Sequence, residues 1–213
     1  MITIYGGWPT RSMRAQWLLE EMNVPYVLRP VDLRHRADDA EFMALNPSGF
    51  LPALRDGDIV MVESVAIMEY LTQRYGPTPL APSKDDPSFT AYLQYLHLGE
   101  AGLAAFLNLV VATRFMAPEQ ERDNWGARMA VQMFFNRLGL VTRRLESSPH
   151  LAGEDFTAAD ISVVYALEMG ARLGLADRYE PPVTAYIQRL TTREAYQQVM
   201  AKSPPRTLPP KPD

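Results

Sequence analysis

Cysteine is absent from the 213 residues of the sequence. This absence excludes disulfides, zinc sites with thiolate ligands, iron–sulfur clusters and any enzyme whose own nucleophile is a thiol. Histidine is scarce, and His35, His97 and His150 lie far apart in the chain, at no spacing typical of metal ligands. We therefore expect no metal.

The sequence also lacks an excess of positive charge. Its 21 lysines and arginines stand against 25 aspartates and glutamates, and the basic residues are scattered rather than clustered. This distribution argues against a nucleic-acid-binding face. The first residues lack the charged start and apolar run of a signal peptide. The most apolar stretch, residues 101–112, is too short to span a bilayer. We expect a cytoplasmic protein that binds neither nucleic acid nor a membrane.

Proline is concentrated in two segments. Residues 76–87 hold four prolines, and residues 203–213 hold five more. Because proline interrupts helices and central strands, we predict a linker over 78–87 and an extended or disordered tail over 203–213. The two folded segments are then residues 1–77 and 88–202.

The two segments differ in periodicity. In the first, strand-like runs alternate with helical ones in the order βαβ–α–ββα, so a parallel pair of strands is extended by an antiparallel hairpin at Asp56-Gly57. Strands are predicted over 2–5 and 26–31, and helices over 12–22, 38–45 and 64–74. In the second, apolar residues recur at steps of three and four, which predicts an all-helical bundle.

Five motifs go beyond generic architecture. They are YGGWPTRSMR at residues 5–14, NPSGFLPAL at 46–54, ESVAIMEYL at 63–71, LAG at 151–153 with FTAADI at 156–161, and REAYQQ at 193–198. In this order and spacing they resemble the cytosolic glutathione transferase family, in a bacterial-type and cysteine-free form, over nearly the whole chain up to the tail. The resemblance implies a thioredoxin-like α/β domain followed by an all-α domain.

The resemblance also implies a glutathione site. A cis Leu51–Pro52 bond is expected to turn the backbone of Leu51 outward, toward the cysteine main chain of glutathione. Ser64 and its N–H, at a helix start, suit the γ-glutamyl carboxylate, and Glu63 suits the ammonium. The alternatives are an ordinary proline at a strand start and a plain helix cap.

The group that activates the thiol is less well defined. A free thiol has a pKa of about 8.5, so the enzyme must stabilise the thiolate through a hydroxyl and the positive end of the first helix. Family members use a tyrosine at the end of the first strand, or a serine or cysteine in the next loop. Tyr5 matches the tyrosine position, but the other two fall on Pro9 and Arg11. We rank Thr10 first, then Tyr5 and Ser12, with backbone N–H groups as a further alternative. Structurally, the hydroxyl residues are also candidates for a helix cap, and Tyr5 for the core.

Two further subsites follow from the resemblance. Phe50 occupies the position where the family often has Lys, Gln or His to bind the glycyl carboxylate, and Arg34, Arg36 or Ser48 are candidate substitutes. The hydrophobic substrate pocket is expected to be lined from both segments, by Trp8, Pro9, Phe106, Val110 and Phe115.

The sequence therefore predicts transfer of the glutathione thiolate to a hydrophobic electrophile, with glutathione as co-substrate and no metal or tightly held cofactor. The resemblance implies a homodimer. Alternatives are a non-catalytic binding or assembly module of the same fold and a glutathione-dependent peroxidase or isomerase. The capping box of Thr157 and Asp160 is expected to serve folding rather than catalysis.

Overall fold

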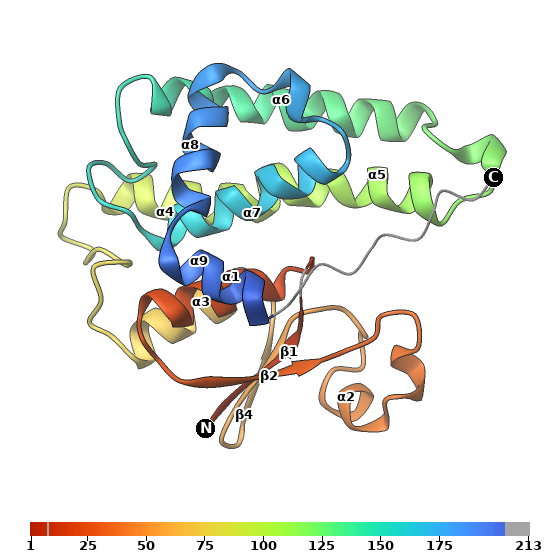
Figure 1. Cartoon of the computed structure of the whole chain (residues 1–213), viewed down its shortest axis with the longest axis horizontal. Helices are drawn as coiled ribbons and strands as arrows, with labels where there is room; N and C mark the ends of the chain where they lie inside the picture. Colours follow the sequence, from red (N-terminus) through yellow and green to blue (C-terminus); the bar gives the residue numbers. More distant parts are fainter. Residues whose placement is uncertain (8, 203–213) are drawn as a thin grey trace. The chain divides into compact units, whose positions relative to one another are not determined.

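The computed structural model of the chain describes residues 1–7 and 9–202 (Figure 1). It contains two compact units. The first is Met1–Thr78 together with the segment that begins at Thr192, and the second is Pro79–Thr191. Trp8 and the predicted tail over 203–213 lie outside the described residues.

The first unit is built around a sheet of four strands in the order β2-β1-β3-β4. β1 and β2 are parallel, and β3 pairs antiparallel with both β1 and β4. This arrangement confirms the predicted βαβ–α–ββα order. The elements are β1 (Ile2–Gly6), α1 (Ser12–Glu21), β2 (Tyr26–Pro30), the short 3-10 helix η1 (Arg36–Asp38), α2 (Ala40–Leu45), β3 (Ala53–Asp56), β4 (Ile59–Val62) and α3 (Ser64–Arg74).

The helix starts and turns follow from individual residues. Gly57 has a positive φ of 61° in the turn between β3 and β4, a conformation that glycine adopts without steric cost. Helix α2 begins at Ala40, later than predicted, because Asp39 acts as its N-cap and its carboxylate accepts from the Phe42 N–H at 3.0 Å. The preceding residues form η1 instead.

A last helix, α9 (Glu194–Lys202), groups with the first unit and packs on α1 (Figure 1). Arg193 donates two hydrogen bonds to the Glu21 carboxylate, at 2.6 and 2.7 Å. The Trp17 ring meets Tyr196 edge-on, with centroids 5.0 Å apart. Thus these contacts tie α9 to the sheet-containing unit, whereas the sequence-based division includes it in the helical segment 88–202.

The second unit, residues 79–191, contains helices and no strand. This confirms the predicted all-helical part. Its elements are α4 (Phe89–His97), the π-helical segment η2 (Leu98–Ala104), α5 (Ala105–Phe115), η3 (Glu119–Glu121), α6 (Trp125–Leu145), α7 (Ala158–Arg172), η4 (Ala176–Arg178) and α8 (Pro181–Thr191). Helices α5 and α6 run side by side (Figure 1).

The segments α4, η2 and α5 form one continuous helix, Phe89–Phe115. Within the described residues, it is the one helix that is long and apolar enough to cross a membrane, by length and composition alone. Half of its most apolar window is buried inside the fold, and the helix packs on α6 and α7. The apolar stretch over 101–112, which was expected to be too short to span a bilayer, is part of this longer element.

The predicted capping box at the start of α7 is present. The Asp160 carboxylate accepts from the Thr157 N–H at 2.8 Å, from the Leu151 N–H at 3.0 Å and from the Tyr186 hydroxyl at 2.7 Å. Since Asp160 is fully buried, its charge is compensated by these donors, which join the preceding loop and α8 to α7.

Candidate functional site

The candidate site lies in the first unit, where the loops before α1, β3 and α3 carry the predicted residues. The peptide bond between Leu51 and Pro52 is cis, as predicted. Pro52 is buried, and Leu51 is half-buried against a small apolar cluster that includes Tyr5 and Phe42. The cluster fixes the position of the loop that leads into β3.

Glu63 and Ser64 form the start of α3. Glu63 has a φ of 70° and a ψ of 106°, a positive-φ conformation that is uncommon for a residue other than glycine. The Glu63 side chain is exposed, whereas Ser64 is 2% exposed. Glu63 is the N-cap of α3, so Ser64 is the first helical residue. The Glu63 side chain makes no cap hydrogen bond. The simple capping alternative for Ser64 therefore does not describe this helix start.

The sequence reasoning missed a functional candidate next to Ser64. Arg14, on α1, is fully buried, and its Nη1 donates to the Ser64 Oγ at 3.1 Å. A single arginine on an amphipathic helix is ordinarily expected at the surface, so no signal in the sequence indicated this contact between residues 50 positions apart.

The loop between β1 and α1 holds a network of hydroxyl groups. The Ser12 Oγ accepts from the Gly7 N–H at 2.8 Å and from the Gln16 Nε2 at 3.1 Å. It also lies 2.8 Å from the Thr10 Oγ1, which lies 2.6 Å from the Gly7 carbonyl oxygen. Ser12 is fully buried and Thr10 is half-buried.

The proton of each hydroxyl in this network can be assigned by counting donors. A hydroxyl has one proton and two lone pairs. Both lone pairs of Ser12 accept, so Ser12 donates, and the Thr10 Oγ1 at 2.8 Å is the nearer of its two acceptors, the other being the Gly7 carbonyl oxygen at 3.3 Å. Thr10 in turn donates to the Gly7 carbonyl. The chain of hydrogen bonds therefore ends at the Gly7 carbonyl, and Thr10 is the less buried of the two hydroxyl residues.

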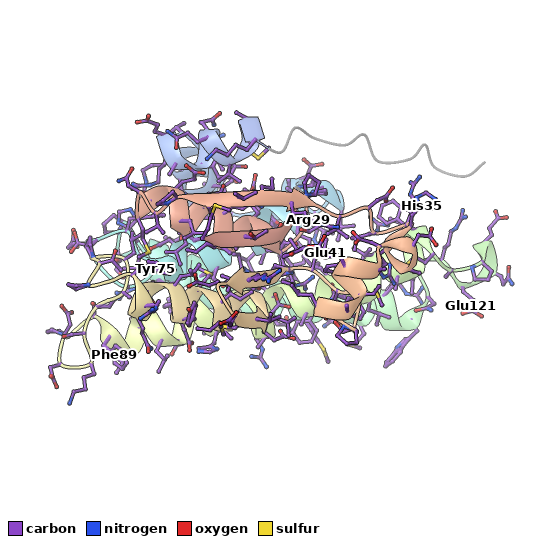
Figure 2. The ribbon with its side chains drawn as sticks, turned by 90° about the horizontal axis from the view of Figure 1, so that it is seen from below. Arg29, His35, Glu41, Tyr75, Phe89 and Glu121 are labelled. Atoms are coloured by element: carbon purple, nitrogen blue, oxygen red, sulfur yellow. The ribbon has the colours of Figure 1, made fainter. Side chains whose placement is uncertain are left out.

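Tyr5 points its hydroxyl toward α2. It donates to the Glu41 Oε1 at 3.0 Å, and the ring is 2% exposed. Glu41 lies 3.4 Å from Arg29, and the two side chains are neighbours in Figure 2. Arg29 also makes a bidentate pair with Asp39. Burial, followed by the hydrogen bond to Glu41, raises the pKa of Tyr5. The tyrosine proton is therefore held by a carboxylate.

The loop expected to meet the glycyl carboxylate is closed by its own hydrogen bonds. The Asn46 Nδ2 donates to the Phe50 carbonyl at 2.6 Å, and the Ser48 hydroxyl donates to the Asn46 Oδ1 at 2.6 Å. Phe50 itself is 75% exposed. Arg36 lies against Gly49, where a Cβ would come within 2.8 Å of the Arg36 Nε. Of the three substitutes considered, Ser48 is therefore part of this loop and Arg36 borders it.

The residues expected to line the hydrophobic pocket come from both units. Pro9 is half-buried in the first unit. On α5 in the second unit, Phe106 is half-buried, Val110 is fully buried and Phe115 is 37% exposed. Among the described residues, no group of three or more His, Cys, Asp or Glu side chains is arranged to hold a metal ion.

Comparisons with known proteins agree with the fold and the motifs. Residues 1–73 match the family model described as the glutathione S-transferase N-terminal domain. Glutathione S-transferase 3 of Schizosaccharomyces pombe is 26% identical, in an alignment that covers 98% of this chain and 90% of the relative. The crystal structure of a glutathione transferase from Methylococcus capsulatus superposes with a TM-score of 0.84 at 25% identity, over 95% of this chain and 98% of the other. These comparisons show that the chain has the glutathione transferase fold and that residues 1–73 carry the N-terminal domain of that family.

One further relative carries a different kind of name. The stringent starvation protein A homolog of Pasteurella multocida is 28% identical, over 90% of this chain and 85% of the relative. This identity is as high as the 26% identity to the transferase of Schizosaccharomyces pombe. Sequence identity alone therefore does not distinguish similarity to the transferases from similarity to the starvation protein.

Proposed function

We propose that the protein conjugates glutathione to a small hydrophobic electrophile. The sulfur of the bound thiolate forms a thioether bond to an electrophilic carbon, and the leaving group departs with its electron pair. The thiol proton passes to solvent when glutathione binds. The proposal depends chiefly on the start of α3, where a positive-φ Glu63 exposes a carboxylate next to the buried Ser64. The first N–H groups of a helix carry partial positive charge, which suits the γ-glutamyl carboxylate.

Glutathione would be held along one edge of the first unit. The backbone of Leu51 would pair with the cysteine main chain of glutathione, with Pro52 fixing that loop. Glu63 would accept from the γ-glutamyl ammonium. Arg36, which borders Gly49 beside Phe50, would supply the charge for the glycyl carboxylate. Trp8, Pro9, Phe106 and Phe115 stay our candidates for contact with the electrophile, whereas Val110 is fully buried and offers no surface to a ligand.

Thr10 is the best candidate to activate the thiol. Its hydroxyl accepts from Ser12, and a hydroxyl that accepts a hydrogen bond is a stronger donor. Redirecting its proton from the Gly7 carbonyl to a thiolate exchanges a neutral hydrogen bond for one to a charged group. Ser12 supports Thr10 from the buried side, and Tyr5 is engaged with Glu41.

The experiment that tests this function is a pH titration of bound glutathione, followed by thiolate absorbance, with S-methylglutathione as the blank. We expect the bound thiol to ionise below the free value of about 8.5. Thr10→Val should raise the bound pKa by about one unit or more, because a hydrogen bond to a charged group contributes about 1.5–3 kcal/mol. Thr113→Val, which removes a hydroxyl bonded to its own helix in the second unit, is the matched control.

A non-catalytic module is the second candidate. The observation that favours it is that the hydroxyl groups of Tyr5, Thr10 and Ser12 all donate their protons to acceptors within the protein. Glutathione that binds with an unshifted thiol pKa would support this module over the transferase. A glutathione-dependent peroxidase or isomerase would show the lowered thiol pKa but would turn over hydroperoxides or isomerisable substrates instead. In either case we propose a cytoplasmic homodimer.

A further inference from the structure

Gln16 is a fully buried amide in α1, one turn after Ser12. Its Nε2 donates to the Ser12 Oγ at 3.1 Å, whereas its Oε1 is buried and has no hydrogen-bond partner. A buried carbonyl oxygen without a donor lowers the stability of a fold. An apolar side chain of the same length would avoid this cost. The hydrogen bond from Nε2 is therefore what the amide contributes at this position.

The short contact between Thr10 and the Gly7 carbonyl fixes the orientation of this amide. The two oxygens lie 2.6 Å apart, a distance that requires a proton between them, and only Thr10 has one. The contact of 2.8 Å between Thr10 and Ser12 then requires the Ser12 proton. Ser12 has no proton left for Gln16, so the amide must direct its N–H, and not its carbonyl, toward Ser12.

The Ser12 hydroxyl is held in place on its other sides as well. It accepts from the Gly7 N–H at 2.8 Å. Gly6, at the end of β1, lies so close that a Cβ there would come within 2.3 Å of the Ser12 Oγ. A hydroxyl oxygen has two lone pairs, and the Gly7 N–H and Gln16 occupy both.

The second lone pair of Ser12 matters when a thiolate binds. Thr10 would then redirect its proton from the Gly7 carbonyl to the sulfur. A competing arrangement exists for the same two hydroxyls, in which Ser12 donates to the Gly7 carbonyl, 3.3 Å away, and Thr10 donates to Ser12. This arrangement would turn the Thr10 proton away from the ligand. It requires a free lone pair on Ser12, which the Gln16 N–H occupies.

We propose that Gln16 is a positioning residue that keeps the Thr10 proton available to the thiolate of bound glutathione. Because Gln16 is fully buried, it acts through Ser12 and not by contact with the ligand. This inference rests on the proposed function, since it assumes that Thr10 donates to the thiolate. It goes further because it assigns the direction of that hydrogen bond to an amide in the core of the first unit.

The test is the thiolate titration of bound glutathione on the full chain, with Gln16→Met, which keeps the length of the side chain and removes the amide donor. We expect the pKa of the bound thiol to rise by about half a unit. This rise should be smaller than that in Thr10→Val, because the Thr10 hydroxyl is still present. The affinity for S-methylglutathione, which has no thiol to ionise, should be unchanged.

A double variant separates this role from a structural one. Thr10→Val combined with Gln16→Met should give the same thiol pKa as Thr10→Val alone, because Gln16 acts through Thr10. Gln198→Met is the matched control, since the Gln198 Nε2 donates to the Glu194 side chain four residues earlier on α9, the same spacing as from Gln16 to Ser12. It should keep the wild-type thiol pKa.

If Gln16→Met does not fold, Gln16→Glu keeps the shape of the side chain and, when ionised, offers only acceptors. It should raise the thiol pKa by more in the wild-type background than in the Thr10→Val background. The rise that persists without Thr10 measures the added charge, and the difference measures the effect that passes through Ser12.

Three results would overturn the inference. A wild-type thiol pKa in Gln16→Met would show that Ser12 needs no second donor, and activation of the thiol by the protein would still stand. An equal rise with and without Thr10 would leave Gln16 with a structural role alone. A bound thiol that is unshifted in the wild type would refute the proposed function and the inference together.

Discussion

At the scale of single residues, the sequence indicated the positions of Ser64 and Leu51 but not the partners that determine their chemistry. Motif spacing places a serine at a helix start, because capping and dipole effects are local. The contact of Ser64 with Arg14 joins residues 50 positions apart, and only packing of α1 on α3 brings them together. Likewise, Tyr5 matches a catalytic position by register, while its hydroxyl is bonded to Glu41.

Replacing Tyr5 with phenylalanine tests this difference. Because the Tyr5 hydroxyl donates to Glu41, Tyr5→Phe should leave the pKa of bound glutathione unchanged. It should lower the free energy of unfolding by about 1 kcal/mol, the usual contribution of one hydrogen bond. Thiolate titration and urea unfolding measure the two effects. A clear rise in the thiol pKa would identify Tyr5 as the donor instead of Thr10.

At the scale of secondary-structure elements, hydrophobic periodicity predicted the strands, the helices and their order. Starts and ends differ where a side chain caps the helix, as Asp39 does for α2. The π-helical segment η2 was not predicted, because its apolar spacing is close to that of an α-helix. Gly99 in this segment approaches Ser162 on α7 so closely that a Cβ would lie 2.3 Å from the Ser162 Oγ.

The Asp39 carboxylate, which caps α2, should make the stability of the protein depend on pH. Its hydrogen bonds with Arg29, and then with the Phe42 N–H, lower the pKa of Asp39 in the folded protein. The stabilisation is therefore complete above the unfolded pKa of about 3.9, and it is lost as the pH falls through the lower folded pKa. Asp39→Asn, which keeps a capping oxygen, should destabilise the protein at pH 7 but not in strong acid. Urea unfolding of the wild type and of Asp39→Asn, from strong acid to pH 7, measures the difference in the free energy of unfolding. A difference that does not change with pH would contradict the prediction.

The capping box of α7 should affect stability without affecting the glutathione site. Asp160→Ala leaves several buried donors without an acceptor, among them the Leu151 N–H and the Tyr186 hydroxyl. We expect a loss of about 3 kcal/mol or more in the free energy of unfolding, measured in urea. The protein that is still folded should bind S-methylglutathione with wild-type affinity. A selective loss of affinity would show that Asp160 belongs to the binding machinery.

At the scale of the whole molecule, each unit carries exposed apolar side chains. Phe50 is 75% exposed in the first unit, and Trp125 and Met116 are 69% and 80% exposed in the second. Such residues are common at interfaces between subunits. The sequence predicted the two-part architecture, because a change from mixed to purely helical periodicity is visible in one chain. Subunit contacts were not predictable by periodicity, since exposed and buried apolar residues look alike in sequence.

Phe50 provides a test of the proposed homodimer. Phe50→Ser should weaken self-association by about tenfold or more, since burial of a large apolar side chain contributes about 1.5–3 kcal/mol. Light scattering coupled to size-exclusion chromatography over a dilution series measures the change. Val27→Ser, on the edge strand β2 and 43% exposed, is the control. Identical dilution profiles for the wild type and Phe50→Ser would remove Phe50 from the subunit interface.

The docking of α9 on α1 also has a consequence for the order in which the chain folds. The first unit combines Met1–Thr78 with a segment that begins at Thr192, so the whole helical unit is synthesised between its two parts. A nascent chain that has emerged only to Thr191 has its sheet but lacks Tyr196 and Arg193, the partners of Trp17 and Glu21. Protection of α1 from a protease on the ribosome should therefore increase once α9 has left the exit tunnel.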